Sequence, residues 1–200
     1  MPRLRLWLLR HAQPLDGHGV CYGAHELAVQ PADTHSAAQA FLSAWGGTQM
    51  PPEVWVSERT RAQDLAHALC AHWSIAGACA PRIDPRLNEF DFGQWEGVPW
   101  AQIPKAAVDA WTADFAHHRF GGQDSTGALV ERVREALQHL LSASESALPL
   151  QTRQVVWVTH AGVIRAVNWL QRGQPTDTLR ADTWPVDAPA FGQWQVVDFP

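Results

Sequence analysis

The sequence has few cysteines, little charge and no long apolar run, and each shortage excludes a class of protein. Its three cysteines, Cys21, Cys70 and Cys79, are an odd number without metal-ligand spacing. They argue for a reducing compartment and against a disulfide framework. No apolar run is long enough to span a bilayer, and Arg10 and His11 interrupt the first one too early for a signal peptide. We therefore expect a cytoplasmic protein without a membrane contact.

Positive charge is also scarce. Fifteen Lys and Arg residues against 20 Asp and Glu give a net charge of −5, so a general nucleic-acid binder is not expected. Any phosphate site must then be a local basic pocket on an acidic surface. A serine elbow, a Walker loop and an HExxH motif are all missing from the sequence. What is present, 46% hydrophobic and 18% charged residues, suits one globular domain over residues 1–200.

Short apolar runs alternate with segments of helical periodicity along the chain. Strands are expected at four runs and at the alternating tail: 6–9, 54–56, 82–84, 155–159 and 191–199. Helices are expected between them: 37–45, from 60 to 73, 103–115, 129–141 and 163–171. Gly46-Gly47 is expected to stop the first helix. Strands that alternate with helices indicate a three-layer α/β/α sandwich.

Two histidines directly follow two of the predicted strands. His11 comes after the first strand, next to Arg10, and His160 comes after the strand at 155–159. Ligands bind at the carboxyl ends of strands in open α/β sheets, so the two imidazoles can converge if their strands are neighbours. A guanidinium beside an imidazole is an anion clamp next to a candidate nucleophile. The alternative is a pair of structural histidines.

Arginines and carboxylates complete this set of residues. Arg59 and Arg61 open a predicted helix, and residues two apart point to nearly opposite sides, so only one is expected to face the site. Glu89, Asp91 and Glu96 share an acidic, aromatic loop, and the pattern alone does not choose among them. Imidazoles, guanidiniums and a carboxyl group suit phosphoryl transfer to a histidine. If the arginines carry the phosphoryl charge, neither a metal nor another cofactor is needed.

Together these segments resemble the motifs of the histidine phosphatase superfamily, also called phosphoglycerate-mutase-like. The matching segments occur in the family's order: Arg10–Ala12, Ser57–Ala62, Glu89–Gly97 and Val158–Arg165. The resemblance implies that His11 is the nucleophile that becomes phosphohistidine and that Glu89 is the proton donor. It also implies a phosphate pocket of Arg10, Arg61 and His160, with Arg61 preferred to Arg59 because Ala62 follows it. The implied fold is a three-layer sandwich on a mostly parallel six-stranded sheet with one antiparallel strand.

Two loops extend the resemblance to a subgroup. The segments Cys21–Leu27 and Asp91–Gly97 are most similar to those of α-ribazole-phosphate phosphatases, which dephosphorylate a nucleotide-loop precursor of cobalamin. Tyr22 and Trp95 are the candidate contacts to the leaving group, although tryptophans more often pack in a core. The implied function is metal-independent hydrolysis of a small phosphomonoester, with α-ribazole 5′-phosphate as the best guess.

Three other functions stay open. A broad-specificity small-molecule phosphatase would share all of these features. A phosphoglycerate mutase would share the fold, but such mutases usually carry extra segments that shield the phosphohistidine. A catalytically silent module would only bind a phosphorylated ligand, and trapping of a phosphoenzyme would separate it from an enzyme. The sequence indicates no nucleic-acid or membrane partner, and it leaves room for a homodimer.

Overall fold

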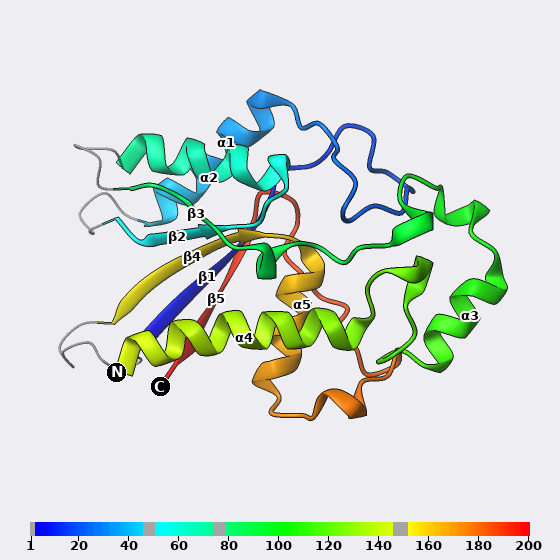
Figure 1. Cartoon of the computed structure of the whole chain (residues 1–200). Helices are drawn as coiled ribbons and strands as arrows, with labels where there is room; N and C mark the ends of the chain where they lie inside the picture. The colour runs from blue at the N-terminus through cyan, green and yellow to red at the C-terminus, as the bar shows by residue number, and fades with distance from the viewer. Residues whose placement is uncertain (1–2, 46–50, 74–78, 146–151) are drawn as a thin grey trace.

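The computed structural model describes residues 3–45, 51–73, 79–145 and 152–200, and a mixed β-sheet lies at its centre (Figure 1). The order of the strands in the sheet is β3-β2-β4-β1-β5. Their bounds are β1 Leu4–Arg10, β2 Glu53–Val56, β3 Arg82–Ile83, β4 Arg153–Thr159 and β5 Trp194–Phe199. All neighbouring pairs are parallel except β1–β5, which is antiparallel. The predicted α/β fold class and the presence of one antiparallel strand are confirmed, and that strand is β5, the last of the chain.

Helices cover both faces of this sheet. α1 (Pro31–Trp45) and α2 (Thr60–Trp73) lie together on one face, whereas α4 (Thr126–Glu145) and α5 (Ala161–Gln171) lie on the other (Figure 1). The fifth helix, α3 (Lys105–Ala113), lies beyond the end of the sheet, among the loops, and none of its residues is fully buried. No described helix combines the length and apolar character that a membrane span requires.

Short 3-10 helices lie in the connections: η1 Pro85–Leu87, η2 Gly93–Trp95, η3 Trp100–Gln102, η4 Phe120–Gly122 and η5 Thr176–Thr178. Two of them, η2 and η4, pack against each other near α3. The long segment between β1 and α1 also approaches this region, because Val20 forms a bridge with Pro99. These connections, together with the start of α5, therefore lie at the carboxyl ends of β1 and β4.

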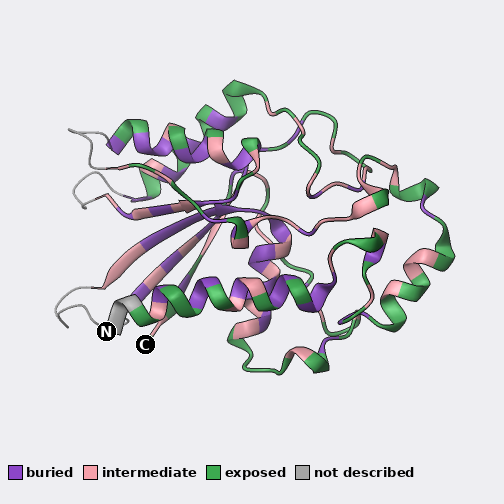
Figure 2. Cartoon of the chain, in the orientation of Figure 1, coloured by how far each residue is buried: buried purple, intermediate pink, exposed green. Residues whose placement is uncertain are grey.

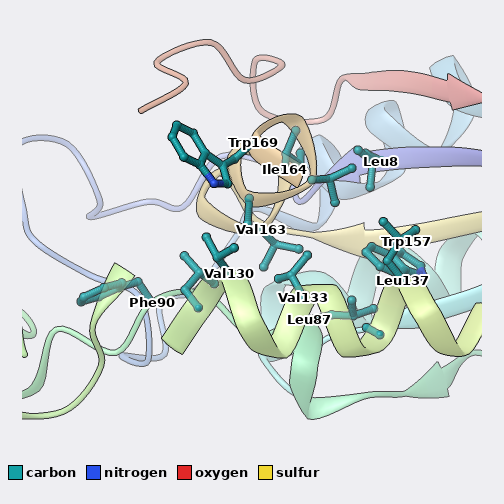
Figure 3. Close-up of a cluster of buried hydrophobic side chains, with 14 of the residues drawn as sticks. Leu8, Leu87, Phe90, Val130, Val133, Leu137, Trp157, Val163, Ile164 and Trp169 are labelled. Carbon is teal, nitrogen blue, oxygen red and sulfur yellow. The ribbon is translucent and has the colours of Figure 1, made fainter. Parts of the chain in front are cut away.

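The sheet separates two apolar cores, and the buried residues concentrate along its strands (Figure 2). On the α4–α5 side, Leu8 and Trp157 of the sheet meet Val133 and Ile164 of the helices (Figure 3). The periodic apolar stripe of α4 explains why this helix lies flat on the sheet. Full burial of each such side chain stabilises the fold by about 1.5–3 kcal/mol, which holds the strand ends in fixed positions.

Two details of the fold differ from the sequence-based expectations. The described residues form a sheet of five strands instead of six. The connection 172–193 contains no strand, and its prolines at 175, 185 and 189 cannot donate backbone hydrogen bonds to a sheet. The helix expected over 103–115 is shorter, because Pro104 precedes its first residue and Asp114 ends it. The expected stop at Gly46-Gly47 lies outside the described residues.

The cysteine prediction is wrong. Cys70 and Cys79 form a disulfide, with Cα atoms 5.1 Å apart, and Cys21 is the remaining, buried cysteine. Cys70 lies near the end of α2, and Cys79 lies shortly before β3. An odd number of cysteines excludes complete pairing but does not exclude one bridge. Only the path of the backbone after α2 could show this pair.

Candidate active site

The register of two parallel strands brings the two histidines together. Arg10 of β1 is paired with Thr159 of β4, so His11 and His160 follow at the same level of the sheet. The backbone N–H of His11 donates to the carbonyl of Thr159 at 3.0 Å. The imidazole centroids are 5.0 Å apart, and the two residues are 2% and 0% exposed. The expected convergence of the imidazoles is confirmed.

The surroundings of His11 select one tautomer. Its Nδ1 lies 2.7 Å from the carbonyl oxygen of Ala12, which can only accept, so Nδ1 carries the proton. The lone pair is then on Nε2. Burial and the positive charge of Arg61 lower the pKa of His11 to about 3, against the opposite effect of the Ala12 bond. His11 is therefore neutral at pH 7 and offers Nε2 as a nucleophile.

The lowered histidine pKa values predict a stability that falls with acidification. The folded state keeps His11 neutral, whereas the unfolded chain binds a proton below pH about 6.5, so the free energy of unfolding falls as pH drops below that value. The contribution of each such histidine is about 1.4 kcal/mol per pH unit. His160 adds to it because burial, together with the positive charge of Arg61, places its pKa well below the usual value. Urea denaturation at pH 7, 6 and 5 should show this slope, with a shallower slope for His11→Asn. Equal slopes would contradict a neutral, buried His11.

Backbone carbonyls, rather than carboxylates, orient the two arginines beside His11. Arg10 donates from Nη1 to the carbonyl of Pro189 at 3.0 Å, and its guanidinium lies 3.7 Å above the Phe191 ring. Arg61 donates from Nη2 and Nη1 to the carbonyls of Gly23 and His25, at 2.6 and 2.8 Å. Burial lowers the pKa of both arginines, but a guanidinium keeps its charge in a protein. Both cations are thus held in place and remain charged.

The structure also separates Arg61 from Arg59. Arg61 is 1% exposed, and its charge is among the causes of the low His11 pKa. Arg59 lies 3.6 Å from the carboxylate of Glu26 and 3.8 Å from that of Glu58, and it lines a neighbouring pocket instead. Of the two arginines, Arg61 therefore belongs beside His11, as the family motif implies.

A buried serine positions His160. The Ser57 hydroxyl is 2.7 Å from His160 Nε2, and its oxygen accepts the backbone N–H of Arg59 at 3.2 Å. Nε2 is the acceptor that the described residues offer to the hydroxyl proton, so we assign Ser57 as the donor and Nε2 as the acceptor. Nδ1 then carries the proton of His160 and can donate it to a ligand.

Each of the three candidate phosphate-binding residues has a buried nitrogen without a partner. Arg10 Nε, Arg61 Nε and His160 Nδ1 are three of the eight buried side-chain atoms that lack a hydrogen-bond partner within the described residues. A buried donor without an acceptor costs about 1–3 kcal/mol. An oxyanion that reached these nitrogens would supply the acceptors that they lack.

Glu89 lies at the entrance to the helix that follows His160. Its Oε2 accepts the Gly162 N–H of α5 and its Oε1 accepts the Phe90 N–H, both at 3.0 Å. A Cβ atom at Gly162 would collide with this carboxylate, so the close approach requires glycine. Arg132 donates from Nη2 to the carbonyl of Glu89 at 2.9 Å and fixes the loop from behind. Glu89 also lines the pocket that His11 and Arg10 line.

Glu96 has a different place in the same loop. Its two carboxylate oxygens accept four backbone N–H groups, those of Gly23, Ala24, His25 and Phe92, at 2.8–2.9 Å. Three successive N–H groups that converge on one anion form a nest. Glu96 is therefore a structural anion of the loop whose carbonyls hold Arg61. Asp91 accepts the N–H of Gly93 and lines the neighbouring pocket, which leaves Glu89 as the carboxylate nearest the chemistry.

The pocket beside His11 has a volume of about 260 Å³ and an aromatic wall. Tyr22, a candidate contact, lines this pocket, and burial raises the pKa of its hydroxyl. Trp95, the other candidate, does not line it, because its half-buried ring packs 6.1 Å from Phe120. Rings that do line the pocket come from several connections: Phe90, Phe92, Trp100, Trp111, Phe115 and Trp184. The aromatic character of the wall was expected, but most of its members were not.

Sequence reasoning missed three supporting residues. Ser57 opens one of the family segments, so its position was a signal that it could have a role. The sequence indicates Glu96 only as an alternative proton donor, and nothing in its spacing reveals the four N–H groups around it. Phe191 was expected to begin the last strand, but it lies under Arg10 before β5 begins. These roles depend on contacts between distant segments.

The fold and the site define an α/β protein with a neutral, buried histidine beside two cationic side chains. The family model of the histidine phosphatase superfamily (branch 1) matches residues 6–187, and the chain belongs to that superfamily. The chain is a phosphatase, as the four short segments predict. A search of curated proteins gave no match.

Solved structures agree with this family. A mycobacterial glucosyl-3-phosphoglycerate phosphatase is 26% identical, with a TM-score of 0.70 over 87% of this chain and 82% of its own. A protein described as mycobacterial hydrolase 1 is 25% identical, with a TM-score of 0.75 over 96% and 90%. The α-ribazole phosphatase from Shigella flexneri is 23% identical, with a TM-score of 0.74 over 98% and 90%, and shares the fold.

Proposed function

We propose that the protein hydrolyses small phosphomonoesters through a phosphohistidine on His11, in two steps. First, Nε2 of His11 attacks phosphorus, the bond to the leaving oxygen breaks, and Glu89 gives that oxygen a proton. Second, Glu89 takes a proton from water, whose oxygen attacks phosphorus while the bond to Nε2 breaks. Inorganic phosphate leaves, and Glu89 is protonated again for the next cycle. Arg10, Arg61 and His160 stabilise the phosphoryl oxygens in both steps.

The three unpartnered nitrogens around His11 carry this proposal. Donors that are already in place where negative charge develops need no reorganisation during the reaction. The nucleophile is also ready, since the bond from Nδ1 to Ala12 leaves Nε2 unprotonated. A silent binding module would need the donors but would gain nothing from a neutral imidazole aimed at the anion. Formation of an acid-labile phosphoenzyme therefore separates these two functions.

For the substrate, we propose α-ribazole 5′-phosphate, which would place the enzyme in cobalamin biosynthesis. The rings around the pocket support a flat or cyclic leaving group, because stacking on an aromatic side chain is worth about 1–3 kcal/mol per base. Tyr22, a predicted contact, lines the pocket, and so does Trp100. Trp95, the other predicted contact, would act only through the rings that it packs against. The second candidate is a phosphorylated glycerate derivative, which the name of the 26% identical relative suggests.

A substrate panel tests this choice. We expect kcat/KM to be highest for α-ribazole 5′-phosphate among a set that includes glucosyl-3-phosphoglycerate, 3-phosphoglycerate, sugar phosphates and a phosphotyrosine peptide. A flat profile would indicate a broad-specificity phosphatase. A preference for the peptide would overturn the small-molecule substrate, and phosphate transfer between the positions of phosphoglycerate would indicate a mutase.

Metal independence is a separate prediction. Arg10 and Arg61 supply the positive charge that metal ions supply in other phosphoryl-transfer enzymes. We expect activity on p-nitrophenyl phosphate to survive exhaustive EDTA treatment within about twofold, since guanidiniums do not exchange. The assay is repeated after Mg²⁺ or Zn²⁺ is added back. A loss that either metal restores would contradict the prediction.

The remaining properties are proposals as well. We propose that residues 1–200 form a single domain, supported by the pairing of β1 with strands from the end of the chain. A cytoplasmic location rests on the early interruption of the first apolar run, and the Cys70–Cys79 disulfide removes the support that cysteine composition gave to it. We propose a small-molecule partner only, with no nucleic acid or membrane, and a homodimer as the assembly to test.

A further inference from the structure

Arg165 lines the pocket of Arg10 and His11, but the proposed chemistry gives it no role. It lies in α5, just after the Glu89–Gly162 contact, and it is half-buried. Its Nε and Nη2 both donate to the carbonyl oxygen of Val186, at 3.2 and 3.0 Å. A guanidinium has five N–H donors in a fixed fork, so this acceptor occupies one edge and leaves the Nη1–Nη2 edge free for a ligand.

The charge of Arg165 is not balanced by a carboxylate. Among the described residues, Arg165 forms no ion pair with an Asp or a Glu. By contrast, Arg86 and Arg132 lie 2.7 and 3.2 Å from aspartates. Arg10 lines the same pocket. Burial lowers the pKa of Arg10, Tyr22 and Glu89 raise it, and the charge of Arg165 lowers it. Two like charges facing one pocket repel each other, and an anion bound there removes that cost.

One segment of chain holds both cations in place. The carbonyl of Val186 binds Arg165 and the carbonyl of Pro189 binds Arg10, while Trp184 from the same segment lines the pocket. The separation between the two guanidiniums is therefore set by the backbone before a ligand arrives. Such preorganisation is what a site needs to recognise two charged groups at a fixed distance.

We propose that Arg165 is a specificity-determining residue that binds a second anionic group, a carboxylate or another phosphate, on the leaving group of the substrate. The inference rests on the proposed phosphomonoester hydrolysis. The fork of Arg165 matches the planar oxygen pair of a carboxylate and two oxygens of a phosphate. The rings of the wall would cover the body between the two anions. α-Ribazole 5′-phosphate has only its scissile phosphate and would not use Arg165, so this subsite would act on the second candidate, a phosphorylated glycerate derivative, and would widen the range of substrates beyond the first.

Matched aryl phosphates test the subsite. We compare kcat/KM for 3- and 4-carboxyphenyl phosphate with kcat/KM for phenyl phosphate, and the ratio of the two values is the measurement. In the wild type the better carboxylated isomer should be preferred, and Arg165→Gln should lower that ratio about tenfold or more, the range of charge-assisted hydrogen bonds. Arg165→Lys should keep part of the preference. The 1,3- and 1,4-phenylene bisphosphates in the same assay distinguish a phosphate-binding from a carboxylate-binding subsite.

Arg172→Gln is the matched control. Arg172 follows the same helix and donates from Nη1 to the carbonyl of Thr183 at 3.0 Å, but it does not line this pocket. Its variant should keep the wild-type ratio. Equal ratios in the wild type and in Arg165→Gln, for every ester with an anionic group besides the scissile phosphate, would overturn the subsite. Failure of the wild type to hydrolyse phenyl phosphate or to form phosphohistidine would instead overturn the proposed function, since that ester has no second anion.

Discussion

His11→Ala should lose turnover by about 10⁴-fold or more, the scale seen when an enzyme loses its nucleophile. The reason is specific to this imidazole. Its Nε2 is unprotonated, the His160 ring lies 5.0 Å from its own, and Arg61 and Arg10 are close enough to lower its pKa. The measurement is kcat/KM on p-nitrophenyl phosphate, together with trapping of an acid-labile phosphoenzyme after denaturation. Neither turnover nor the phosphoenzyme should be detected.

Two further variants keep this result interpretable. His11→Asn retains an amide that can donate to the Ala12 carbonyl, and it should be folded but inactive. His117→Ala removes an exposed histidine that pairs only with Asp114 and should leave the phosphoenzyme yield intact. Circular dichroism and thermal melting check that each variant is folded. Turnover near the wild-type rate in either His11 variant would end the phosphohistidine mechanism.

Glu89→Gln should have the second-largest effect, and the effect should depend on the leaving group. General acid catalysis is typically worth about 10²–10⁴-fold. An alkoxide needs a proton to leave, so hydrolysis of an alkyl phosphate should fall by about this factor. The p-nitrophenolate ion leaves without help, and hydrolysis of its ester should fall far less. The glutamine oxygen can still accept the Gly162 N–H, but the amide NH2 cannot accept the Phe90 N–H, so the dependence on the leaving group, and not the size of the loss, reports the proton.

Asp91→Asn is the control for this variant. Asp91 shares the loop with Glu89 and accepts the N–H of Gly93, but it does not line the pocket of His11. Its substitution should affect both esters alike. Equal losses on the alkyl and aryl esters in Glu89→Gln would mean that Glu89 only supports the loop. A strong leaving-group dependence in Asp91→Asn would transfer the role of the acid to Asp91.

The sequence predicted the centre of the site better than its surroundings. Placement after two apolar strands was enough to bring His11 and His160 together, because parallel neighbours end at the same edge of a sheet. The choice of Arg61 over Arg59 needed the family motif. Both arginines stand at the start of the same predicted helix, so periodicity alone could not choose between them. Short-range periodicity thus identified the residues that strands and helices place directly.

The surroundings could not be predicted because they depend on contacts between distant connections. Trp95 has an aromatic ring of the kind that contacts substrates, yet this ring packs against Phe120. The bridge between Cys70 and Cys79 depends on how the chain returns after α2. Arg165 ends one of the family segments, but only the fold shows that Val186 binds it near Arg10. No local pattern contains these distances.

The two peptide groups that follow Gly23 connect Glu96 to the arginines electrically. The Gly23–Ala24 peptide has its carbonyl on Arg61 and its N–H on Glu96, and the next peptide joins Arg59 to Glu96 in the same way. Because C=O and N–H point in opposite directions in a trans peptide, both dipoles, about 3.5 D each, run from the carboxylate to a guanidinium. Glu96 therefore fixes the peptide whose carbonyl holds Arg61, without touching the arginine itself. Neutralising Glu96 would weaken the hold of the pocket on phosphate from a position that the phosphate never reaches.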